Sequence, residues 1–183
     1  VATDGQPMIT TESANNTLEF WSVDNAGNEE THHIPTGIKL DKTVPVGSIA
    51  INGGDAYATS SSVTLNLIAI DATSGVFQVR YSSDGVWDTE IWETPSTTKP
   101  WTLSAGNEAQ TVYCQIMDNA GLVSATFSGS IILDTTPPTG SVTIDEGTAY
   151  TAKTLVTLTL TSEDEVSGVA QMRFSNDETV WTP

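Results

Sequence analysis

Basic residues and cysteine are scarce in this sequence. Six lysines and arginines face 23 aspartates and glutamates, which leaves a formal net charge of -17 at pH 7. A surface this acidic argues against nucleic acid and anionic membranes as partners, since both are polyanions. It suits cation binding or solubility in salty water, or is simply a solvated acidic face. The single cysteine, Cys114, excludes a disulfide framework within the chain.

Long apolar runs and helical periodicity are also missing. No run reaches the ~18 residues that span a bilayer, so we expect no membrane insertion by this segment. No signal peptide is recognisable. The sequence begins "VATDGQPMIT", without Met, and stops at "NDETVWTP". We expect both ends to have been cut from something longer.

Catalytic constellations are absent as well. The only histidines, His32 and His33, are adjacent on an expected strand and so point to opposite faces. Paired carboxylates such as Glu163 and Asp164 lie in loops without an apolar pocket that would raise a pKa. We therefore expect no enzyme and no catalytic residues.

The sequence does contain an internal repeat. "LDKTVPVGSI" starts at Leu40 and "LDTTPPTGSV" at Leu133, and the two copies stay in register for some forty residues. "VDNAGN", from Val23, likewise matches "MDNAGL", from Met117. The period of about 93 residues is typical of whole domains in tandem. It predicts a complete repeat over 41–133, preceded by the back half of a repeat (1–40) and followed by the front half of another (134–183).

Within a repeat, apolar and polar residues alternate with period two, and turn sequences such as "NGGD" and "DNAG" separate the runs. This pattern predicts an all-β fold of antiparallel β-sandwiches. In the expected strand over 77–82, the apolar residues Phe77, Val79 and Tyr81 alternate with Gln78 and Arg80, and Cys114 is inward and buried on a later strand. The expected strands, named A, B, C, E, F and G in chain order, are 46–51, 62–70, 77–82, 99–104, 110–117 and 123–132.

Three stretches carry a resemblance to a known family: "LDTTPPTGSV", "DATSGVFQVRYSSDG" and "PWTLSAGNEAQTVYCQIMDNAG". In this order they are similar to the bacterial and archaeal immunoglobulin-like, or fibronectin type III-like, repeats of large extracellular surface proteins. The resemblance implies tandem immunoglobulin-like sandwiches at the cell surface. It also implies the role of a spacer or an adhesive module.

Aspartates recur at fixed places in the repeat. They start each repeat, end strand B and open the "DNAG" loop after strand F. In such a sandwich these places share one end, so Asp41, Asp71 and Asp118 should converge. Carboxylates brought together repel unless a cation or protons intervene, and Ca²⁺ prefers hard oxygen ligands. We therefore predict calcium at the junctions; the alternative is separate turn-forming aspartates. The candidate ligands are Asp41, Asp71, Asp118, Asp134, Asp164 and Asp24.

Two tryptophans and one asparagine give further hypotheses. Trp87 and Trp92 lie in the long connection after strand C, where exposed rings would stack on sugars; the alternative is packing across the sheet edge. Asn15 begins "NNT", a weak sequon for N-glycosylation that requires export.

Three functions therefore compete. The preferred one is a semi-rigid spacer, stalk or filament-forming segment of an extracellular surface protein, with repeats joined end to end and stiffened by junction prolines and calcium. The rival is an adhesive module that binds cell-surface glycans. A third is an accessory spacer of a secreted enzyme.

The end pieces give a prediction about partners. We expect the half repeats to be completed by neighbouring repeats of a longer chain, or head to tail by identical subunits. In the second case Asp24 of one copy would join Asp134 and Asp164 of the next.

Overall fold

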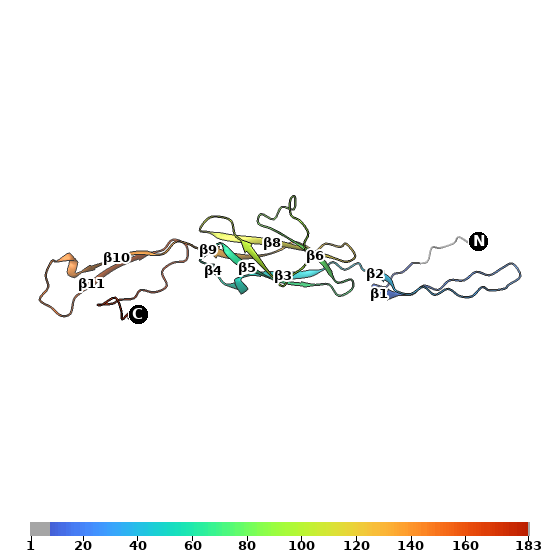
Figure 1. The fold of residues 1–183 in the computed structure, drawn as a ribbon, viewed down its shortest axis with the longest axis horizontal. Coiled ribbons are helices and arrows are strands. Elements are labelled where there is room, and N and C mark those ends of the chain that lie inside the picture. The colour runs from blue at the N-terminus through green and yellow to red at the C-terminus, as the bar shows by residue number, and fades with distance from the viewer. Residues whose placement is uncertain (1–7, 183) are drawn as a thin grey trace. The chain divides into compact units, whose positions relative to one another are not determined.

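The structure is a computed structural model that describes residues 8–182. Within this range it holds strands and two short 3₁₀ turns, η1 (Asn52–Gly54) and η2 (Asp145–Gly147), but no α-helix (Figure 1). No helix among the described residues is long and apolar enough to cross a membrane. The strands are β1 (Ser13–Asn16), β2 (Ile38–Leu40), β3 (Val46–Ile51), β4 (Tyr57–Ala58), β5 (Ser62–Ile70), β6 (Val76–Ser82), β7 (Thr98–Thr102), β8 (Ala109–Asp118), β9 (Phe127–Leu133), β10 (Thr139–Ile144) and β11 (Leu158–Glu163).

Residues 41–133 form two sheets, with strand orders β3-β5-β7 and β4-β9-β8-β6. In sandwich nomenclature, strands A, B and E form one sheet, and strands G, F and C form the other. The chain is therefore an all-β protein with an immunoglobulin-like antiparallel β-sandwich, as the alternation predicts. The number of repeats stays a prediction.

Several strand boundaries differ from those expected. Strands A and B have the predicted bounds, but strand E covers 98–102 and strand G starts only at Phe127. Val123, the expected start of strand G, forms only an isolated bridge with Met117 of β8. The short strand β4 has no counterpart in the prediction; it pairs in parallel with β9, so that Tyr57 lies opposite Ile132.

The side-chain alternation of β6 is broken at its start. Val79 and Tyr81 are buried as predicted, but Phe77 is 52% exposed. The pairing of β6 with β8 shifts register between Val76 and Gln78. Because a one-residue shift moves side chains to the other face, Phe77 does not share the buried face of Val79 and Tyr81, and the expected alternation fails at this residue.

The chain divides into two compact units, each with its own buried residues. The first comprises residues up to 50 with 66–99 and 112–129, and the second comprises 51–65, 100–111 and the residues from 130 onward. The apolar residues buried in the first unit are Ile49, Leu67, Val79, Tyr81, Val112, Cys114 and Ile116. Those of the second unit are Ile51, Ala58, Val63, Leu65, Leu103, Ile131 and Leu133.

Gly47, in β3 of the first unit, lies where the backbone approaches a neighbouring strand. A Cβ there would lie 2.4 Å from the carbonyl oxygen of Ile68 and 2.6 Å from Cδ1 of Ile116. Only glycine therefore fits without displacing the strand.

Two antiparallel pairs lie outside residues 41–133. β1 pairs with β2, so that Ser13 lies opposite Leu40, and bridges such as Phe20–His33 continue the hairpin. β10 pairs with β11 over their full lengths. β10, η2 and β11 follow the order of β3, η1 and β5 about 93 residues earlier in the sequence.

Candidate metal centre

Asp118 is the last residue of β8 and its side chain is completely buried. Its Oδ1 accepts hydrogen bonds from the backbone N–H groups of Ala120 and Leu122, both at 2.8 Å. Its Oδ2 is buried without a hydrogen-bond partner. Burying a carboxylate oxygen unpaired is unfavourable, which makes Oδ2 a candidate metal ligand.

Asp71 directly follows β5 and organises the loop before β6. Its Oδ1 accepts hydrogen bonds from the N–H groups of Thr73, Ser74 and Gly75 at 3.2, 2.8 and 2.7 Å. Gly75 has a φ of +80°, a left-handed conformation that favours glycine at the end of this turn. The loop therefore holds one carboxylate oxygen of Asp71 in a fixed position.

Asn119 ties the Asp71 loop to the Asp118 loop. Its side-chain Nδ2 donates to the carbonyl oxygens of Ser74 and Gly75, both at 2.9 Å, and its backbone N–H donates to Gly75 O at 3.0 Å. The "DNAG" sequence thus both supplies a carboxylate and clamps the neighbouring loop beside it.

Asp41 supplies the third carboxylate from the junction after β2. Its Oδ1 accepts from the N–H of Thr43 at 3.0 Å, while its Oδ2 is buried without a partner. The nearby hydroxyl of Ser74, followed by the N–H of Thr43, holds the pKa of Asp41 below its ordinary value, although burial opposes the shift.

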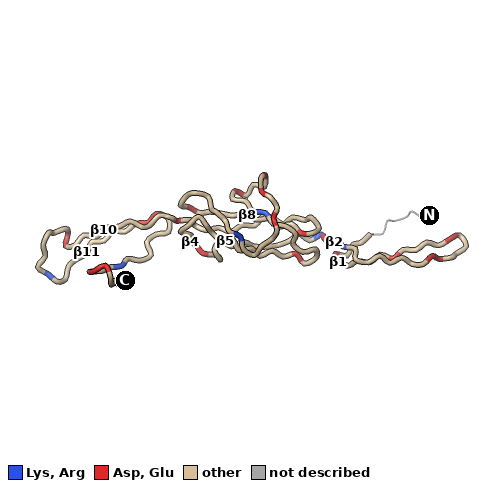
Figure 2. Tube along the Cα trace, viewed as in Figure 1, with Lys and Arg blue, Asp and Glu red and all other residues tan. Residues whose placement is uncertain are grey.

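The structure brings Asp41, Asp71 and Asp118 together, as the loop positions predict. Each offers a carboxylate oxygen, and these oxygens all lie within 4.8 Å of one another. None of the ion pairs formed by residues 8–182 involves these three side chains. Acidic residues occur along most of the chain whereas basic residues are few (Figure 2). The donor set is that of a hard divalent cation such as Ca²⁺, although metal binding itself stays a prediction.

Glu12 is a fourth carboxylate at this place, and the sequence analysis missed it. Its Oε1 accepts from the N–H of Thr43 at 3.2 Å and from Thr73 Oγ1 at 3.3 Å. The internal repeat does not mark Glu12, because the alignment that matches Val23 with Met117 places Gly106 opposite Glu12.

The junction that follows β9 and begins at Asp134 repeats part of this arrangement. Asp134 Oδ1 accepts from the N–H of Thr136 at 3.0 Å, and Asp164 Oδ1 accepts from the N–H groups of Ser167 and Gly168, both at 2.8 Å. Asp134 and Asp164 line one pocket with Asn107 and two glutamates, Glu163 and Glu165. The loops are thus folded as at the first junction, but among the described residues only Asp41, Asp71 and Asp118 form a three-carboxylate cluster.

Asp24 occupies the "DNAG" loop of the first hairpin. Its Oδ1 accepts from the N–H groups of Ala26 and Asn28, both at 2.8 Å, and its Oδ2 accepts from Asn28 Nδ2. These bonds, the Asn28 side chain first, hold the pKa of Asp24 below its ordinary value. The loop matches that of Asp118, although Asp24 is solvent-exposed.

The two tryptophans proposed for glycan binding are partly buried and stack on one arginine. The guanidinium carbon of Arg80 lies 4.6 Å from the ring centroid of Trp87 and 4.6 Å from that of Trp92. Cation–π contact therefore engages both rings, and sugar binding by them stays a prediction.

Both histidines stack on aromatic rings: His33 on Phe20 and His32 on Trp21.

Asn15, the first residue of the sequon, lies exposed in β1. The sequon is therefore accessible, and glycosylation stays a prediction.

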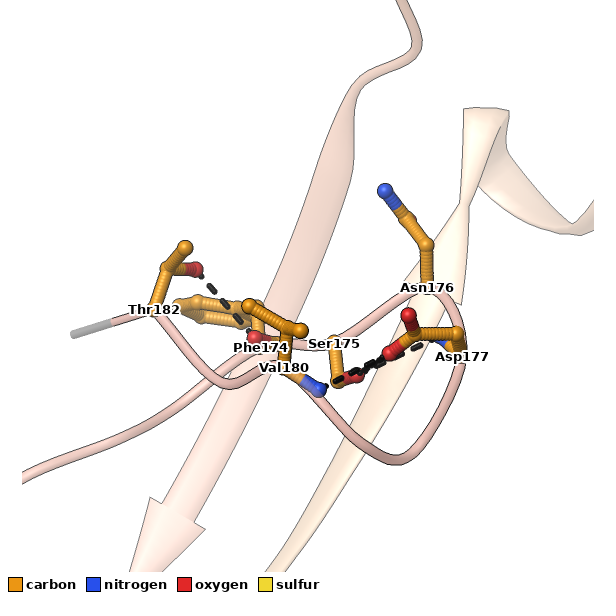
Figure 3. A pocket seen from close by; sticks show the side chains of 6 residues that line it. All are labelled: Phe174, Ser175, Asn176, Asp177, Val180 and Thr182. Atoms are coloured by element: carbon orange, nitrogen blue, oxygen red, sulfur yellow. Dashed lines mark hydrogen bonds between the residues drawn. The ribbon is translucent and has the colours of Figure 1, made fainter.

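A shallow pocket near the end of the chain is lined by few ionisable residues (Figure 3). It lies in the turn around Asp177, which is its only acidic residue. Asp177 Oδ1 accepts from Ser175 Oγ at 3.0 Å and from the N–H groups of Thr179 and Val180 at 2.9 Å. These bonds lower the pKa of Asp177, so the group acts as a turn-forming acceptor.

No family model and no curated protein matches the chain. Among solved structures, the crystal structure of the PKD1 domain of Vibrio anguillarum Epp is similar at 14% identity and a TM-score of 0.37. The match covers 51% of this chain and 100% of that domain. A similarity of this size adds nothing to what the strand order already shows.

Proposed function

We propose that the chain is a structural segment of an extracellular surface protein, a spacer or stalk whose repeats are joined at calcium-binding junctions. The supporting observation is the completely buried Asp118, whose Oδ2 has no hydrogen-bond partner and lies in a cluster with Asp41 and Asp71. A divalent cation would offset the mutual repulsion of three carboxylates that no basic side chain within residues 8–182 pairs.

Calcium binding to the folded state alone should raise the melting temperature as free Ca²⁺ rises. We expect the wild-type chain to melt at a higher temperature in millimolar Ca²⁺ than in EDTA, and Asp118→Asn to lose this difference. Asp177→Asn, which alters an acidic turn outside the cluster, is the matched control and should keep it. If Ca²⁺ leaves the wild-type melting curve unchanged, the junction holds no calcium.

The exposed apolar face of β10 and β11 supports a second part of the proposal, which concerns partners. Five positions that are 0–7% exposed in residues 41–133 have counterparts 38–58% exposed in residues 134–182, and four of these counterparts lie in β10 and β11. A neighbouring repeat, or an identical subunit bound head to tail, would cover this face and supply the missing strands. The buried and exposed counterparts are Ile49 and Val142, Ile51 and Ile144, Leu65 and Leu158, Leu67 and Leu160, and Val79 and Met172.

A further inference from the structure

Glu12 contacts both turns that hold the first two aspartates of the candidate metal centre. Thr43, whose N–H lies 3.2 Å from Glu12 Oε1, also donates to Asp41 Oδ1 at 3.0 Å. Thr73, whose hydroxyl lies 3.3 Å from Glu12 Oε1, donates its N–H to Asp71 Oδ1. One N–H is therefore shared between the carboxylates of Glu12 and Asp41.

These contacts do not neutralise the charge of Glu12. Its two donors are a backbone amide and a hydroxyl, and no ion pair within residues 8–182 includes Glu12. A fourth carboxylate thus lies at the turns of Asp41 and Asp71, and two of the three aspartates have a buried oxygen without a hydrogen-bond partner. Like charges so placed destabilise one another unless a cation binds among them.

The following junction offers a partial parallel, because an oxygen acceptor from the preceding segment contacts Thr135, the residue before the counterpart of Thr43. Asn107 Oδ1 accepts from the N–H and the hydroxyl of Thr135 at 3.0 and 2.8 Å, and Asn107 Nδ2 contacts Thr136 Oγ1. Carboxylate and amide carbonyl oxygens are both Ca²⁺ ligands. An oxygen side chain from the segment before each junction therefore contacts that junction in both copies.

We propose that Glu12 belongs to the same cation site as Asp41, Asp71 and Asp118, so that a bound Ca²⁺ ties the segment before the junction to the loops after it. The inference rests on the proposed calcium site and assigns to it a ligand from the preceding segment. Calcium would then order residues 8–40 as well as stabilise the sandwich.

The test is calorimetric titration of the whole 183-residue chain with Ca²⁺. Glu12→Gln keeps an acceptor for Thr43 and Thr73 but removes the charge. We expect it to weaken the Kd about tenfold, while Glu29→Gln, which removes a charge from the same segment, leaves the Kd unchanged. In hydrogen exchange, Ca²⁺ should protect residues 8–40 in the wild type, and protect them less in Glu12→Gln.

The outcomes separate the two proposals. If the wild type binds Ca²⁺, Asp118→Asn abolishes binding and Glu12→Gln binds like the wild type, the role of Glu12 is wrong and the calcium site stands. If the wild type binds no Ca²⁺, both proposals fail. A melting temperature of Glu12→Gln in EDTA that equals or exceeds that of the wild type would show that a lower affinity reflects lost ligation rather than lost folding.

Discussion

The carboxylate of Asp118 combines complete burial with one oxygen that lacks a partner, and this combination has a cost that can be measured. In EDTA, Asp118→Asn should stabilise the fold by about 1–3 kcal/mol, because it removes an uncompensated buried charge. Its Oδ1 would keep the bonds from Ala120 and Leu122, and its Nδ2 would donate to a neighbouring carboxylate. Urea denaturation in EDTA measures the change, and a destabilised variant would show that the charge is already compensated.

Cys114 makes a second prediction at the residue scale. It is completely buried, and burial, followed by the charge of Glu93, raises its pKa from an ordinary 9.0 to about 12. The native thiol should therefore stay unmodified by a disulfide reagent at pH 8, and react only after unfolding.

The raised pKa of Cys114 also determines how the free energy of unfolding depends on pH in alkaline solution. Between pH 9 and 12 the unfolded chain loses the thiol proton while the folded chain keeps it, so the free energy of unfolding falls as pH rises. Tyr81, whose pKa burial also raises, acts in the same direction. Cys114→Ala should reduce the number of protons released on unfolding between pH 9 and 12 by up to one. This number follows from the slope of the free energy of unfolding against pH, measured by denaturant titration. An unchanged slope would contradict the raised pKa of Cys114.

At the scale of elements, the repeat provides a matched pair of leucines. Leu65 in β5 is 1% exposed, whereas its counterpart Leu158 in β11 is 41% exposed. Leu65→Ala should lower the free energy of unfolding by about 2–5 kcal/mol, and Leu158→Ala by less than about 1 kcal/mol. Urea denaturation of dilute protein compares the two. Equal losses would mean that β11 is already covered in solution.

At the scale of the whole molecule, the uncovered face of β10 and β11 predicts association. If identical subunits cover this face, sedimentation of the 183-residue chain should show a mass that increases with concentration. The reason is that head-to-tail contacts add subunits without forming a closed ring. Leu160→Asp, on the uncovered face, should suppress this assembly without changing the melting of the sandwich. A folded monomer at every concentration would exclude completion between subunits and leave neighbouring repeats of a longer chain.

The sequence alone determined the features that depend on neighbouring residues. The bounds of β3 and β5 follow from period-two alternation between turn sequences, and the repeat places three aspartates at loops that share one end of a sandwich. Alternation and turn chemistry are local, so a single sequence displays them.

Only the tertiary structure decided the features that depend on distant pairing. The register shift that exposes Phe77, the contact of Glu12 with Thr73, and the contact of Arg80 with two tryptophan rings all join separate segments. The lack of a partner for Asp118 Oδ2 is likewise a property of everything packed around it. No local pattern encodes such contacts, because folding sets them by bringing distant segments of the chain together.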